Sequence, residues 1–299
     1  MRLIHIFVAF CLWFCLSSAQ AGTPQVVVSI KPLHSLAAAV MADVGEPTLL
    51  LSGGESVHSY SMRPSDARAV RGADLVVYVS PQLEAFLEPS LEARNDQSGN
   101  LAAAQLEGIR LLDARRADDW HEGEEAAAGH GHSHKHKRDY HLWLDPHNAR
   151  VIARAMAERL AELDAANAEQ YRRNARELEQ RLRSLDEELE RRVEQVRDRP
   201  YVVFHDAYQY FERSYGLESA GVVTLTPEQR PGGRHLLELR NQISELGVAC
   251  VFVEPQFKPA IVRSLTRGLD VSIGELDPIG ADLDPGPEAY FELLEGLAD

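Results

Sequence analysis

The sequence contains few cysteines, and two of the three lie in an N-terminal segment that we expect to be removed from the folded protein. It has three cysteines in 299 residues, and Cys11 and Cys15 both lie in an apolar segment near the N-terminus. We expect residues 1–21 to be an export signal, because Arg2 is followed by a mainly apolar run and then by small residues typical of a cleavage site. Cys250 is then alone in the exported chain, which excludes an internal disulfide.

Positive charge is also scarce. The chain has 31 Lys and Arg against 46 Asp and Glu, which gives a formal net charge of −15. This balance argues against nucleic acid and anionic lipid as partners, and it favours attraction of cations. After the first residues, no apolar run approaches the ~20 residues that a membrane-spanning helix needs. We therefore expect a monomeric protein of the periplasm that has neither a membrane span nor a lipid anchor.

Short apolar segments alternate with helical patterns along most of the chain. The candidate strands cover residues 26–30, 47–51, 75–79, 201–204, 221–225, 249–253 and 271–273. The candidate helices between them cover residues 32–44, 65–71, 235–246 and 259–269. This alternation predicts an α/β protein made of two Rossmann-like lobes with mostly parallel sheets.

A long helix is predicted between the two lobes. We expect an N-terminal lobe at 22–163, a linking helix at 164–198 and a C-terminal lobe at 199–299. Apolar residues from Tyr171 to Val196 follow a mostly 4-3 rhythm, which places them on one narrow stripe of a charged helix. If unbroken, this helix is about 50 Å long and acts as a rigid strut. A coiled-coil dimer helix is the alternative interpretation.

The predicted N-terminal lobe is interrupted by an insertion at residues 115–138 that is rich in Glu, Ala, Gly and His. Histidine occupies every second position at His130, His132, His134 and His136. Imidazole is the commonest metal ligand in proteins, so the tract indicates metal binding. The composition around it predicts a disordered loop that collects metal loosely, because a selective site needs ligands held in a fixed geometry.

A more selective site is predicted where strands end. Ligands of α/β lobes collect beyond the carboxyl ends of the strands, and His58, His141, His205 and Asp277 all occupy such positions. Three histidines and one carboxylate fit a tetrahedral Zn²⁺ shell, whereas manganese prefers more carboxylate. Glu254, at another strand end, is a candidate to support a ligating histidine. From position alone, a structural role for each histidine is the competing interpretation.

Several motifs along the chain resemble the ZnuA-type zinc-binding proteins of ABC importers. They lie at residues 52–66, 141–146, 203–208, 254–257 and 276–280. The resemblance covers essentially the whole exported chain. It implies a periplasmic solute-binding protein with metal in the cleft between two lobes. It also implies that His58 and His141 belong to the first lobe and His205 to the second.

The resemblance also bears on the choice of metal and on the partners. The manganese proteins of this family tend to have a carboxylate where His205 stands, which favours zinc here. Some relatives have a glutamate directly before the first histidine; this chain has Val57, which gives more weight to Asp277 as the fourth ligand, with water as the alternative. The implied partner is an inner-membrane ABC permease, and a periplasmic metallochaperone is a second candidate.

Other functions are weaker interpretations of the same residues. A manganese or iron importer protein of the same fold is the nearest alternative. A secreted zinc hydrolase would use Glu254 or Asp206 as its base, but the chain has neither a His-Glu-x-x-His signature nor a nucleophile elbow. A metal buffer or adhesin-like protein of the same fold is the third possibility. We therefore expect a binding protein rather than an enzyme.

Overall fold

A computed structural model describes residues 22–299 apart from positions 95, 117–136, 228 and 258–259. The predicted export segment at 1–21 and the histidines from His130 to His136 lie outside the described residues. Within the described ranges, no helix is long and apolar enough to cross a membrane.

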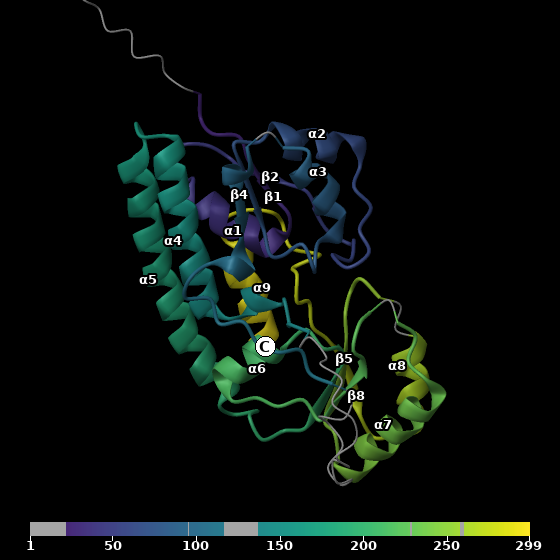
Figure 1. The fold of residues 1–299 in the computed structure, drawn as a ribbon. Coiled ribbons are helices and arrows are strands. Elements are labelled where there is room, and N and C mark those ends of the chain that lie inside the picture. The colour runs from purple at the N-terminus through teal and green to yellow at the C-terminus, as the bar shows by residue number, and fades with distance from the viewer. Residues whose placement is uncertain (1–21, 95, 117–136, 228, 258–259) are drawn as a thin grey trace, which may run out of the picture.

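The strands form two parallel sheets of four strands each, which confirms the predicted two-lobe α/β fold (Figure 1). The first sheet has the order β2-β1-β3-β4 and the second the order β6-β5-β7-β8, so the two sheets share one topology. In each sheet the strand order reverses beside the first strand, which is where ligands of such folds bind. The strands are β1 (Val26–Val28), β2 (Thr48–Leu49), β3 (Leu75–Tyr78), β4 (Asn100–Ala102), β5 (Tyr201–His205), β6 (Gly221–Thr224), β7 (Cys250–Val253) and β8 (Ser272–Glu275).

Helices cover the sheets and join the lobes. They are α1 (Lys31–Val40), α2 (Pro64–Gly72), α3 (Glu88–Glu92), α4 (Pro146–Leu163), α5 (Ala168–Val193), α6 (Gln209–Tyr215), α7 (Gly233–Glu245), α8 (Ala260–Leu265) and α9 (Ala289–Ala298). Short 3-10 turns are η1 (Ala85–Leu87), η2 (Gln97–Gly99), η3 (Ala103–Gln105) and η5 (Leu142–Leu144). The predicted long strands and helices are present with shifted ends, whereas β4, α3, α6 and α9 were not predicted because they are short or lack a clear period.

The long helix predicted at 164–198 is α5, which is shorter than expected. Its 26 residues correspond to about 39 Å. The predicted apolar stripe is buried from Tyr171 to Val193, whereas Val196 lies beyond the helix and is 42% exposed. The stripe packs against α4, α1 and α9, and α5 also contacts α6 of the second lobe (Figure 1). The helix is therefore one half of a helical hairpin with α4.

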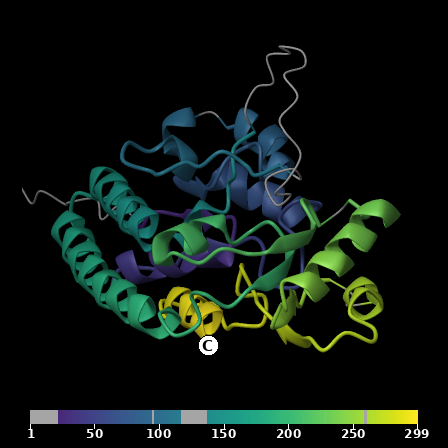
Figure 2. The same cartoon turned by 90° about the horizontal axis from the view of Figure 1, so that it is seen from below.

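The C-terminal helix α9 packs on the first lobe, although the predicted C-terminal lobe of 199–299 would place it on the second. Helix α9 packs against α1 and α5, and Figure 2 shows the yellow α9 beside the purple α1. Tyr290 is fully buried; its backbone N–H donates to Ser35 Oγ at 2.9 Å and its hydroxyl donates to the Trp143 carbonyl at 2.7 Å. One apolar core thus includes the first sheet, α5, α9 and the inner side of α6.

A buried acid, Glu84, stabilises the turn after β3. Its Oε2 accepts hydrogen bonds from the backbone N–H groups of Val79 (2.7 Å) and Ser80 (2.8 Å), and its side chain has no solvent exposure. Burial raises the pKa of Glu84 from 4.5 to about 7, despite the hydrogen bonds that favour the charged form.

This shift predicts a pH-dependent contribution to stability. The folded protein keeps the Glu84 proton up to about pH 7, whereas the unfolded chain loses it near the ordinary pKa of 4.5, so the free energy of unfolding falls as pH rises through that window. Relative to the parent, we expect Glu84→Gln to gain about 2–3 kcal/mol between pH 5 and pH 8. Urea unfolding at both pH values measures this difference, and a difference that does not change with pH would contradict the assignment.

Candidate metal centre

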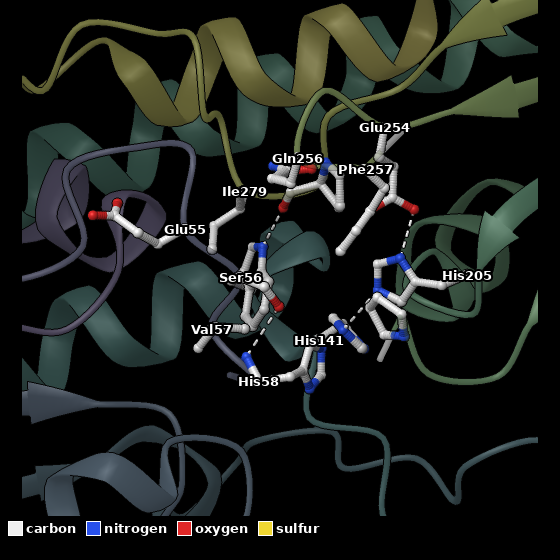
Figure 3. A pocket seen from close by; sticks show the side chains of 13 residues that line it. Glu55, Ser56, Val57, His58, His141, His205, Glu254, Gln256, Phe257 and Ile279 are labelled. Carbon is white, nitrogen blue, oxygen red and sulfur yellow. Dashed lines mark hydrogen bonds and ion pairs between the residues drawn. The ribbon is translucent and has the colours of Figure 1, made fainter. Parts of the chain in front are cut away.

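Three histidines from both lobes converge between the two sheets. His58 lies in the loop after β2, His141 directly precedes η5, and His205 is the last residue of β5. One ring nitrogen from each lies within 4.8 Å of the other two. The Nε2 atoms of His141 and His205 are 3.4 Å apart, and Figure 3 shows the three rings turned toward one another. The structure therefore brings together the three histidines predicted from sequence.

The cavity beside these rings is small and mostly apolar. Its volume is about 30 Å³, which is room for one or two particles the size of water. Trp143, Phe257 and Ile279 contribute large apolar side chains to its wall. The full lining is Glu55, Ser56, Val57, His58, His141, Trp143, His205, Pro227, Glu254, Gln256, Phe257, Pro278 and Ile279. A cavity of this size suits a single ion.

His205 is held by a carboxylate, as predicted for Glu254. Glu254 follows β7, the neighbour of β5 in the second sheet, and its Oε1 lies 2.5 Å from His205 Nδ1 (Figure 3). Burial alone would lower the pKa of His205, but the charge of Glu254 and this hydrogen bond raise it. The contact occupies Nδ1, so Nε2 is the nitrogen directed toward the other histidines.

His141 has an equivalent partner, Asp139, which our sequence analysis did not identify. Asp139 Oδ1 accepts hydrogen bonds from His141 Nδ1 (2.8 Å) and from the His141 backbone N–H (2.9 Å). The hydroxyl of Tyr210 on α6 donates to the Asp139 carbonyl (2.7 Å) and accepts from the Leu112 backbone N–H (2.9 Å). The spacing Asp-x-His was the available signal, since a carboxylate two residues before a ligand can reach its ring.

His58 differs from the other two because its imidazole Nε2 has no hydrogen-bond partner among the described residues, although the atom is buried. Burial, together with the positive charge that His141 and His205 can carry, lowers the pKa of His58 to about 3. The ring is therefore neutral at pH 7, which is the form that binds metal. An unpaired buried imidazole nitrogen costs free energy that a metal ion would recover.

The structure does not bring the fourth predicted ligand, Asp277, to this group. Asp277 is absent from the set of mutually close ligand atoms and does not line the cavity. Its Oδ1 accepts hydrogen bonds from the backbone N–H groups of Ile279 (3.2 Å) and Gly280 (2.9 Å). The carboxylate thus stabilises the turn of its own loop. These backbone donors occupy the oxygen that a metal ion would otherwise bind.

Comparison with known proteins identifies the family of this chain. A family model described as "Zinc-uptake complex component A periplasmic", ZnuA, matches residues 26–299. This chain belongs to the ZnuA family. The chain is 37% identical over 315 residues to the protein named high-affinity zinc uptake system protein ZnuA from Brucella abortus (strain 2308), covering 97% of this chain and 94% of that protein. The protein of the same name from Yersinia pestis is 37% identical over 290 residues, covering 93% and 90%.

Solved structures have the same fold. A crystal structure of ZnuA superposes with a TM-score of 0.74 at 24% identity, covering 92% of this chain and 96% of that one. The solute-binding protein FpvC from Pseudomonas aeruginosa, described in complex with Mn²⁺, superposes with a TM-score of 0.75 at 25% identity, covering 93% and 96%. The two-lobe fold is therefore shared by a ZnuA and by a protein described in complex with Mn²⁺, so the fold alone does not identify the metal.

The support of His141 by Asp139 predicts a measurable loss of affinity. Replacing Asp139 with alanine removes the acceptor that orients the ring, so we expect Asp139→Ala to weaken Zn²⁺ binding about 10–100-fold. Competition against a chromophoric chelator measures the dissociation constant. Asp113→Ala is the matched control, because Asp113 is an exposed carboxylate on a neighbouring segment that pairs with Arg138. Equal affinities for Asp139→Ala and the parent protein would show that Asp139 does not support the site.

Proposed function

We propose that this chain binds one Zn²⁺ ion through His58, His141 and His205 in the periplasm and delivers it to an ABC-type importer in the inner membrane. The observation that carries the proposal is the convergence of three imidazoles from two lobes on a cavity of about 30 Å³. Membership of the periplasmic zinc-uptake family and the names of the relatives support the same function. Zinc is the cargo in this proposal, and it is not a catalytic cofactor.

The donor set supports zinc over manganese. Neutral imidazole nitrogen is a preferred donor for zinc, whereas manganese prefers carboxylate and water oxygen. The carboxylates of Asp139 and Glu254 are hydrogen-bonded to the Nδ1 atoms of His141 and His205, so they act on the rings from outside the group. Three imidazoles leave one position of a tetrahedral shell, which a solvent molecule fills in this proposal.

The site is poorly suited to hydrolysis, which was the alternative enzymatic function. The two candidate bases already have partners: Glu254 is hydrogen-bonded to His205, and Asp206 forms a buried ion pair with Arg115. Arg115 also pairs with Glu212 at 2.6 Å. These contacts favour retention of an ion over chemistry on a substrate.

The first test of the proposal is a metal titration of the histidine group. We expect the double variant His58→Ala, His141→Ala to lose the tight Zn²⁺ site seen by isothermal titration calorimetry, because it removes two of three ligands. His147→Ala is the matched control, since His147 pairs with the Gly108 carbonyl at 3.1 Å outside the cavity. If the double variant bound one zinc ion as tightly as the parent protein, the proposed site would be wrong.

A second test concerns the histidine tract, for which we propose an accessory role in collecting zinc. Deletion of residues 117–136 removes His130, His132, His134 and His136. We expect one tight Zn²⁺ site to remain and weaker sites to disappear, because the proposed tight ligands all lie outside the deleted segment. Zinc stoichiometry by equilibrium dialysis distinguishes the two classes. Loss of the tight site on deletion would instead place primary ligands in the tract.

The delivery step needs its own measurement. In membrane vesicles that contain the partner permease and its ATPase, the zinc-loaded parent protein should stimulate ATP hydrolysis and zinc uptake. The double variant at His58 and His141 serves as the unloaded control. Tight zinc binding without any stimulation would support a periplasmic metal buffer instead of an importer component.

A further inference from the structure

Asp277 is next to the metal cavity in sequence but is held outside it in space. The two residues that follow it, Pro278 and Ile279, line the cavity, whereas Asp277 does not. Gln256, which also lines the cavity, donates a hydrogen bond from Nε2 to Asp277 Oδ1 at 3.1 Å. The Gln256 side chain therefore contacts both the cavity and the displaced carboxylate.

The backbone around Asp277 is fixed on both sides. Alternate carbonyl groups of its loop accept hydrogen bonds from three other elements: Tyr208 Oη donates to Leu276 (3.3 Å), Trp143 Nε1 to Pro278 (2.7 Å), and Lys31 Nζ to Gly280 (2.5 Å). Lys31 Nζ donates to the carbonyls of Ala281 and Leu283 as well. A shift of the whole loop would break these contacts, so the carboxylate can reach the cavity only by rotation of its own side chain.

Rotation is opposed by three donors that share one oxygen. Two are the backbone N–H groups of Ile279 and Gly280, which belong to the fixed loop. The third is the Gln256 amide, the one donor of the three that comes from a different segment of chain. Gln256 Oε1 is buried and has no hydrogen-bond partner among the described residues, so the contact with Asp277 orients this amide.

We propose that Gln256 is a specificity-determining residue, which holds Asp277 away from the metal cavity. This inference rests on the proposed zinc site. With Asp277 restrained, an incoming ion meets three imidazole nitrogens and no carboxylate oxygen from this loop. That donor set favours zinc, whereas release of Asp277 adds the oxygen ligand that manganese prefers. The selectivity of the site thus depends on a residue that need not bind the metal.

The test is a double-mutant cycle of Gln256→Leu and Asp277→Asn. Leucine removes the amide donor, and asparagine removes the carboxylate charge. Dissociation constants for Zn²⁺ and Mn²⁺ are measured on all four proteins by competition. The Co²⁺ absorption spectrum provides a second readout, because its intensity falls when a further ligand joins a tetrahedral site.

We expect Asp277→Asn alone to leave zinc affinity within about threefold of the parent, because Asp277 is not a ligand there, a change below 1 kcal/mol. Gln256→Leu should raise Mn²⁺ affinity relative to Zn²⁺ about tenfold and weaken the Co²⁺ bands, because the carboxylate then joins the three imidazoles and the solvent molecule as a fifth ligand. The double variant should lose both effects. Gln256→Met replaces Gln256→Leu if the leucine variant has a lowered melting temperature.

Two outcomes would overturn the proposal. A loss of zinc affinity of more than about tenfold in Asp277→Asn would mean that the carboxylate already binds the ion in the parent protein. An unchanged ratio of manganese to zinc affinity in folded Gln256→Leu and Gln256→Met would mean that Gln256 does not restrain it. Failure of the zinc site itself is distinguishable, since the parent protein would then lack a tight site that depends on His58 and His141.

Discussion

The metal centre depends on a fixed separation between two sheets that are far apart in sequence. His58 and His141 are carried by the first lobe and His205 by the second, yet their ring nitrogens lie within 4.8 Å of one another. A single apolar core that includes α5, α9 and the inner side of α6 holds this separation. Because packed interiors deform little, this packing keeps the three imidazoles close together.

The carboxylates around the proposed site contact other protein groups and are not among its proposed ligands. Asp139 and Glu254 orient imidazole rings, and Asp277 stabilises a loop. Each negative charge is therefore paired with hydrogen-bond donors of the protein. The chain carries a net charge of −15, which attracts cations in general, while the imidazole nitrogens of the proposed site select the cation that is retained. Acidic residues thus attract cations, and the proposed histidine site distinguishes between them.

The sequence was sufficient to predict the features that depend on strand ends and helical period. His58, His141, His205 and Glu254 follow from the rule that ligands collect at the carboxyl ends of parallel strands. The same rule proposed Asp277, but its hydrogen bonds to the N–H groups of Ile279 and Gly280 depend on the path of one loop. No periodic pattern encodes that path.

Contacts between segments far apart in the sequence could not be predicted either. The role of Asp139 requires Tyr210 to cross from α6 and fix the backbone of Asp139. The stripe of α5 was readable because its period is regular, but the helix ends at Val193, before the exposed Val196. The position of α9 could not be inferred, since its sequence has no clear period and does not distinguish between the two lobes.

The packing of α9 affects the order in which the chain can fold. The first lobe lacks part of its core until residues 289–298 are present, because Tyr290 packs between α1 and the segment that carries His141. A chain that emerges from its N-terminus, whether from a ribosome or from an export channel, cannot complete this lobe early. The core around Tyr290 is therefore completed only after the last residues of the chain are free.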